Sequence, residues 1–144
     1  MQWKALFLFL CISYASSSLP FSVPAALSYH KHNQKEYQFD QIYTTERNIL
    51  GNNVQELRCA VITGNEHFTA GPVKVNVLDR IGTGDSFVAG VLYGINNQYN
   101  PQDTINFALS SFALKHTIVG DFQIASKADV QQFDVDNEKV VIKR

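Results

Sequence analysis

Apolar and polar positions follow two different periods in the middle of the chain. Residues 73–78 (Val-Lys-Val-Asn-Val-Leu) alternate with a period of two, which is typical of a half-buried strand. After them an apolar helical face recurs at steps of three and four, formed by Phe87, Val88, Val91, Leu92 and Ile95. Gly82 and Gly84 lie between the two patterns. The sequence therefore predicts a strand, a glycine-rich turn and a helix in succession.

The segments before this turn also show short periodic patterns. They predict a helix over Pro24–Tyr37 and a strand over Gln41–Thr45. Two further strands are expected over Leu57–Ile62 and Glu66–Ala70, joined by a hairpin turn at Gly64-Asn65.

Capping residues mark the elements that follow. Asn100 is expected to cap a helix that has Pro101 at its first position and ends near Lys115. Ser126 and Asp129 form a capping pair for a short last helix, and 140–142 predict a closing strand. This order of helices and strands predicts an α/β layered domain.

The glycine-rich turn carries the chemistry that the sequence suggests. Such a turn directs backbone N–H groups out of a helix N-terminus, where the helix dipole favours an anion such as a phosphate. Asp85, at the start of the helix, could take a proton from an attacking hydroxyl while the N–H groups stabilise the transferred group. A Rossmann fingerprint fits poorly because Phe87 stands where the third glycine is needed, and a P-loop is excluded because Asp85 follows Gly84. The combination of an anion hole and a carboxylate suggests phosphoryl transfer.

Asp79-Arg80-Ile81-Gly82-Thr83-Gly84-Asp85-Ser86-Phe87 resembles the second signature of the PfkB (ribokinase-like) carbohydrate kinases, most closely the 2-keto-3-deoxygluconate kinase branch. A second segment, Leu114-Lys115-His116-Thr117-Ile118-Val119-Gly120-Asp121-Phe122, looks like the downstream motif of the same branch. The resemblance covers residues 28–144. It implies a ribokinase-like three-layer α/β sandwich, of which this chain would be the C-terminal part, because family members are considerably longer.

The resemblance also implies roles for individual residues. Asp85 would be the catalytic base for the sugar hydroxyl. Gly82, Thr83 and Gly84, with the backbone of Asp85, would form the anion hole for the γ-phosphate of ATP. Asp121 falls where this branch places a carboxylate close to the sugar acid.

Further roles concern the nucleotide and a cation. Thr45 resembles a threonine that approaches the nucleotide phosphates, although Glu46 follows it where relatives have an apolar residue. Asp79 and the Ile81 carbonyl align with a site for a monovalent cation. The adenine pocket would be walled by Ala108, Phe112 and Gly120, and Mg2+ would arrive with ATP, held mainly by phosphates and water.

Each of these positions has a structural alternative. Asp85 could cap its helix, Asp79 could satisfy backbone donors at the strand end, and Asp121 could shape a turn. Thr45 could be an ordinary strand residue. Ala108 and Phe112 could be core residues of a helix. For Asp85 the two matched motifs favour the catalytic interpretation, whereas the core interpretation is the default for the helical pair.

Composition narrows the class of protein. With 144 residues, 45% apolar and 17% charged, the chain suits one compact domain. A net charge of -1 without a basic run gives no sign of a nucleic-acid partner. Cys11 and Cys59 cannot form a disulfide framework, and His30 and His32 lack the companions of a zinc site. The oligomeric state is left open, a homo-oligomer included.

Residues 1–27 lie outside the resemblance. Lys4, an apolar run over Ala5–Ile12 and the small residues that follow look like a signal peptide, and the run is too short for a stable membrane span. We favour a buried strand or an unrelated leader, and a cytoplasmic location, because a kinase needs ATP. Three functions stay open: a sugar or sugar-acid kinase with little activity alone, an inactive nucleotide-binding remnant, and a secreted non-enzymatic domain.

Overall fold

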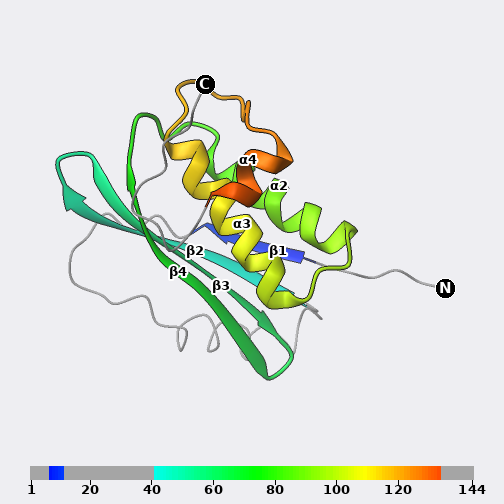
Figure 1. Cartoon of the computed structure of the whole chain (residues 1–144). Coiled ribbons are helices and arrows are strands. Elements are labelled where there is room, and N and C mark those ends of the chain that lie inside the picture. Colours follow the sequence, from blue (N-terminus) through cyan, green and yellow to red (C-terminus); the bar gives the residue numbers. More distant parts are fainter. Residues whose placement is uncertain (1–6, 12–40, 134–144) are drawn as a thin grey trace.

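The computed structural model describes residues 7–11 and 41–133. Four strands form one sheet in the order β1-β2-β3-β4: β1 (Phe7–Cys11), β2 (Gln41–Gly51), β3 (Val54–Thr63) and β4 (Glu66–Asn76). Strand β1 pairs in parallel with β2, and the other neighbours are antiparallel. The helices are α2 (Thr83–Asn96), α3 (Pro101–His116) and α4 (Lys127–Gln132) (Figure 1). The helix expected over 24–37 and the strand expected over 140–142 lie outside the described residues.

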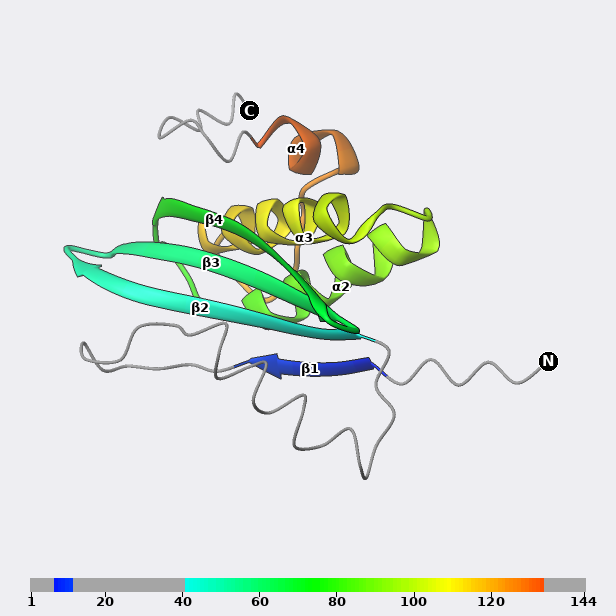
Figure 2. The same cartoon turned by 90° about the horizontal axis from the view of Figure 1, so that it is seen from below.

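The described helices lie on the same side of the sheet (Figure 2). Helix α3 packs on β3 and β4, α2 packs alongside α3, and α4 contacts the side of α3 away from the sheet. No helix within the described residues is long and apolar enough to cross a membrane. The expected α/β fold is thus confirmed.

Alternation along the strands supplies the sheet side of the core. On β2 and β3 every second side chain faces the helices, as Tyr43, Leu57 and Cys59 do. They belong to the same buried cluster as apolar side chains of α2 and α3. These helix side chains are Phe87, Val91, Ile105, Leu109 and Phe112. Burial of this cluster is the main stabilising term for the domain.

The hairpin at Gly64-Asn65 is confirmed, since Thr63 pairs with Glu66 across the turn. The strand boundaries differ from the sequence expectation in two places. β2 continues from Thr45 to Gly51, and the two strands expected over 66–70 and 73–78 form one strand, β4, that ends at Asn76.

A bulge explains why Gly71-Pro72 does not divide β4. Leu57 pairs with Val73 and Cys59 pairs with Ala70, so Gly71 and Pro72 together oppose only Arg58. Proline has no N–H to contribute to a strand ladder, and a bulge is a position where none is needed. Periodicity alone does not show that the ladder resumes after such an interruption.

The helix caps are as expected from the sequence. The Asn100 side chain accepts a hydrogen bond from the Asp103 N–H at 2.8 Å, and Pro101 is the first residue of α3. Ser126 and Asp129 form a reciprocal capping box at the start of α4.

Helices α2 and α3 approach closely because small residues line their contact. A Cβ added to Gly90 would lie 2.8 Å from the Cα of Ala108, so a side chain there would meet backbone. Two serines add buried hydrogen bonds across the same contact: Ser86 Oγ donates to the Ser111 carbonyl at 2.9 Å, and Ser111 Oγ donates to the Ser86 carbonyl at 3.0 Å. This close pair fixes the position of the α2 N-terminus relative to α3.

Replacing Gly90 by leucine should therefore push α2 away from α3. We expect Gly90→Leu to lower the free energy of unfolding by about 1–3 kcal/mol, as overpacking does, measured by chemical denaturation. Ala89→Leu places the same side chain on the exposed neighbouring position and should change stability by less than about 0.5 kcal/mol. Equal losses in the two variants would contradict the close contact.

Candidate active site

The loop between β4 and α2 ends in a backbone conformation that suits glycine. Gly82 is the N-cap of α2, with a φ of 71°, and a Cβ there would collide with the carbonyl oxygen of Asp121. Helical bonding starts at Ser86, whose N–H donates to the Gly82 carbonyl at 3.0 Å. Within the described part of the chain, the N–H groups of Gly84 and Asp85 donate to no acceptor. These groups have the geometry of an anion hole.

Asp85 is the third residue of α2, and its side chain is exposed beside these N–H groups. The alternative in which Asp85 caps the helix is wrong, because the N-cap is Gly82 and no side chain caps this terminus. A carboxylate at this position can receive a proton from a hydroxyl that approaches an anion held at the helix terminus. Its role as catalytic base stays a prediction.

Asp79 holds the loop in place through three backbone N–H groups. Its Oδ1 accepts from Arg80 at 2.6 Å and from Ile81 at 3.0 Å, and its Oδ2 accepts from Gly120 at 2.9 Å. The hydrogen bonds from Ile81 and Gly120 lower the pKa of Asp79 below its usual range, so the carboxylate is ionised at neutral pH. The structural alternative for Asp79 is thus present, and the monovalent cation at Asp79 and Ile81 stays a prediction.

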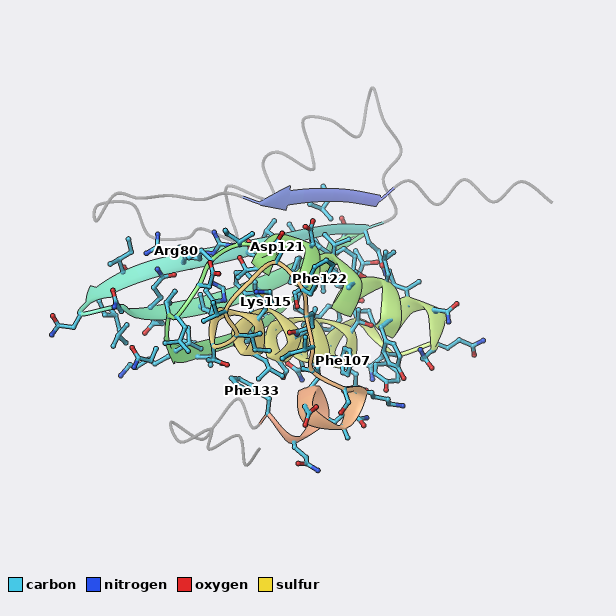
Figure 3. All side chains as sticks on the ribbon, turned by 90° about the horizontal axis from the view of Figure 1, so that it is seen from above. Arg80, Phe107, Lys115, Asp121, Phe122 and Phe133 are labelled. Atoms are coloured by element: carbon cyan, nitrogen blue, oxygen red, sulfur yellow. The ribbon has the colours of Figure 1, made fainter. Side chains whose placement is uncertain are left out.

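The second sequence motif lies directly against the first. Lys115 is fully buried, and its Nζ donates to the carbonyl of Ile118 at 3.1 Å and to that of Gly120. The Leu78 N–H also donates to the His116 carbonyl at 2.8 Å. Figure 3 shows Lys115, Asp121 and Phe122 close together in this region, with Arg80 toward the strands. Asp121 is exposed there, on the same side as the loop that contains Gly82.

Arg47 of β2 reaches the start of α2 from the sheet. Its Nη2 donates to Thr83 Oγ1 at 2.8 Å, and its guanidinium lies 5.0 Å from the centroid of the Phe112 ring. Thr83 Oγ1 in turn donates to the Arg80 carbonyl at 2.9 Å. The sequence reasoning missed Arg47 and gave Lys115 no role. The period of two in β2 could have placed Arg47 on the same face as Thr45.

The nucleotide-side candidates lie at different depths. Thr45 is buried in β2 opposite Cys59, while Ala108 and Phe112 have no exposed surface and belong to the core. These are the places that the structural alternatives require. Gly120 lies in the loop region, with a φ of 92°. A role for any of the four at a nucleotide stays a prediction.

His116 is a fully buried imidazole behind the two loops. Its Nδ1 lies 2.7 Å from the Phe112 carbonyl, which can only accept, so the proton is on Nδ1 in the neutral ring. Desolvation, followed by the positive charges of Arg47, Arg80 and Lys115, outweighs that hydrogen bond and lowers the pKa of His116 to about 4. The imidazole is therefore neutral in the folded protein at pH 7.

Comparison with known proteins agrees with this geometry. Residues 58–122 match the model of the pfkB family carbohydrate kinases, a segment that contains the loop and both sequence motifs. A search of curated proteins found no match.

Several solved structures share the fold. The 2-dehydro-3-deoxygluconokinase of Thermotoga maritima superposes with a TM-score of 0.75 at 23% identity, over 88% of this chain and 40% of that protein. A putative 2-keto-3-deoxygluconate kinase from Enterococcus faecalis gives 0.74 at 22% identity, over 94% and 42%. A PfkB family carbohydrate kinase from Listeria grayi gives 0.71 at 22% identity, over 87% and 40%. This chain thus spans about two fifths of the length of these structures.

The fold is that of the ribokinase-like kinases. The resemblance to the PfkB carbohydrate kinase family is confirmed as well, by the sequence match over 58–122 and by the fold over most of the chain.

The buried imidazole predicts how stability depends on pH. An unfolded histidine binds its proton near pH 6.5 and His116 in the folded protein only near pH 4, so the unfolded state binds more protons between these values. Stability is fully present above pH 6.5 and is lost as the pH falls toward 4, by about 3 kcal/mol on this account. We expect His116→Phe to flatten the dependence of the free energy of unfolding on pH in this window.

Urea denaturation at a series of pH values measures this dependence. His67→Gln is the matched control, because His67 lies exposed on β4, and it should leave the slope unchanged. If the free energy of unfolding of His116→Phe changed with pH as steeply as that of the wild-type chain, another group would be responsible for the dependence.

Proposed function

We propose that this chain supplies the nucleotide side and the catalytic base of an ATP-dependent carbohydrate kinase, and that the substrate is a sugar acid of the 2-keto-3-deoxygluconate type. The observation that carries the proposal is the helix N-terminus with outward N–H groups at Gly84 and Asp85 and an exposed carboxylate beside them. The match over 58–122 to the pfkB family supports the reaction class, and the names of the Thermotoga and Enterococcus proteins support the substrate class.

In the proposed step Asp85 takes the proton of a substrate hydroxyl. The hydroxyl oxygen forms a bond to the γ-phosphorus of ATP while the bond from that phosphorus to the β,γ-bridging oxygen breaks, and ADP leaves with the electron pair. The N–H groups of Gly84 and Asp85, with Gly82 and Thr83 shaping the turn, stabilise the negative charge on the transferred phosphoryl group.

Mg2+ would neutralise charge on the phosphates when it is bound. No three metal-ligating side chains converge within the described residues, which fits an ion that arrives with the nucleotide. In the same proposal Asp121 lies on the substrate side of the loop, and Asp79 with the Ile81 carbonyl holds a monovalent cation. Because the reaction uses ATP, the proposal goes with a cytoplasmic location.

A nucleotide-binding remnant without catalysis is the second candidate. The fact that favours it is the share of the related structures that the chain spans, about two fifths. Asp85 and Asp121 are both exposed, so nothing in the described residues encloses a substrate between them. Phosphoryl transfer requires that water be kept from the reacting groups.

We therefore expect the purified chain to have little or no kinase activity. A coupled assay for ADP with 2-keto-3-deoxygluconate as the substrate measures this, and ATP binding is measured separately by titration calorimetry. Sugar-dependent ATP turnover by the chain alone would contradict the expectation.

The role of Asp85 is tested in a protein that also contains the part of the related kinases that this chain does not span. Residues 28–144 are joined behind the N-terminal part of the Thermotoga kinase, and turnover is compared with that of the Asp85→Asn variant. Loss of the base should reduce kcat by about 100-fold or more and leave much of the ATP affinity.

Asp103→Asn is the matched control, because Asp103 is the exposed third residue of α3 as Asp85 is of α2. It should keep the turnover. Unchanged turnover in Asp85→Asn would remove Asp85 from the mechanism, and ATP binding without turnover in the joined protein would favour the remnant.

A further inference from the structure

We propose that Arg47 is a positioning residue of the anion hole: it fixes the α2 N-terminus through Thr83 and places a full positive charge behind the phosphate site. The inference rests on the proposed function and deepens it. The sequence resemblance assigns no role to Arg47. Thr45 is the residue of β2 to which it gives one.

The hydroxyl of Thr83 is held on both sides. It accepts a hydrogen bond from Arg47 Nη2 at 2.8 Å and donates one to the Arg80 carbonyl at 2.9 Å. Thr83 is 1% exposed and is the first residue of α2, directly before the N–H groups of Gly84 and Asp85. Fixing this hydroxyl therefore fixes the turn from which those donors project.

The guanidinium is itself held in one place. It lies over the Phe112 ring with 5.0 Å to the centroid, and Phe112 is fully buried in an edge-to-face contact with Phe87 of α2. Arg47 thus contacts the sheet, α3 and the start of α2 at once. A lysine could carry the same charge. It lacks the planar guanidinium group, which can stack on the Phe112 ring and at the same time donate a hydrogen bond to Thr83 from its edge.

The charge of Arg47 adds to the field of the helix. A helix N-terminus carries about half a positive charge, and a guanidinium bonded to the first helical residue adds a whole one on the side away from solvent. After desolvation, the positive charge of Arg47 is one of the causes that lower the pKa of His116, which lies behind the same loops. Phosphates at Gly84 and Asp85 would therefore be attracted by Arg47 without touching it.

A double-mutant cycle tests the inference. Arg47→Met removes the charge and the hydrogen bond, and Thr83→Val removes the hydroxyl with little change in shape. Thr83→Val should weaken ATP binding by about tenfold and Arg47→Met by more, because Arg47→Met also removes the charge. The double variant should bind ATP no more weakly than Arg47→Met alone, because both changes break one linkage. Adenosine, which carries no phosphate, should bind each variant as it binds the wild-type chain.

Arg58→Met is the matched control, since Arg58 is exposed on β3, pairs with Glu56 at 2.9 Å and, as the strand neighbour of the buried Leu57 and Cys59, lies on the opposite face of the sheet. It should bind ATP as the wild-type chain does. Arg47→Lys keeps the charge and should fall between wild type and Arg47→Met. Equal losses of ATP and adenosine binding, or losses that multiply in the double variant, would overturn the inference.

A ligand-free measurement separates this inference from the proposed function. The amide NMR signals of Gly84 and Asp85 should shift alike in Arg47→Met and Thr83→Val, and they should stay in place in Arg58→Met. If the wild-type chain bound no ATP, the proposed nucleotide site would fail, and these shifts would still decide whether Arg47 holds the turn. Unmoved signals in Arg47→Met would show that it does not.

Discussion

The carboxylate of Asp79 joins two loops, and the residue it reaches in the second loop, Gly120, is 41 positions away in the sequence. It accepts from Arg80 and Ile81 on one side and from Gly120 on the other, and the rest of the candidate site is built around this link. With the two loops tied, the Asp121 backbone lies against Gly82, where only a glycine fits. These hydrogen bonds hold the two loops in one relative position.

Two positively charged side chains donate hydrogen bonds to the same two loops. Lys115 reaches the carbonyls of Ile118 and Gly120, and Arg47 reaches Thr83 from the sheet. Burying cations is unfavourable unless their donors find acceptors, and here the acceptors are the backbone and hydroxyl oxygens of the two loops. Desolvation, followed by the positive charges of Arg47, Arg80 and Lys115, lowers the pKa of His116, so that its imidazole is neutral. A loop held by cations on its inner side and lined with outward N–H groups suits a phosphate on its outer side.

The chain spans only part of the length of its structural relatives. The shared part holds the sheet, the helix pair and the turn, and it amounts to about two fifths of the related structures. In the described residues the carboxylates Asp85 and Asp121 face solvent. The proposed binding of a phosphate and the enclosure of a substrate are therefore separate questions. For this reason ATP affinity and catalytic turnover have to be measured separately for this protein.

The sequence by itself determined the elements around the turn and their chemistry. Local rules sufficed for the Gly64-Asn65 hairpin, the Asn100 and Ser126 caps and the strand-turn-helix at Gly82, because each depends on neighbours within a few residues. The two sequence motifs also indicated the resemblance to the PfkB carbohydrate kinases. Local rules did not show that β4 continues through a bulge at Gly71-Pro72, since that depends on the partner strand.

Only the tertiary structure decided how the candidate residues relate to one another. It placed Ala108 and Phe112 in the core, showed that Asp79 links two loops, and brought Arg47 to Thr83 across 36 positions. None of these contacts has a sequence period, because they arise where the sheet and α3 converge on the start of α2. Spacing along a chain fixes which residues share a face, whereas packing between elements fixes which faces meet.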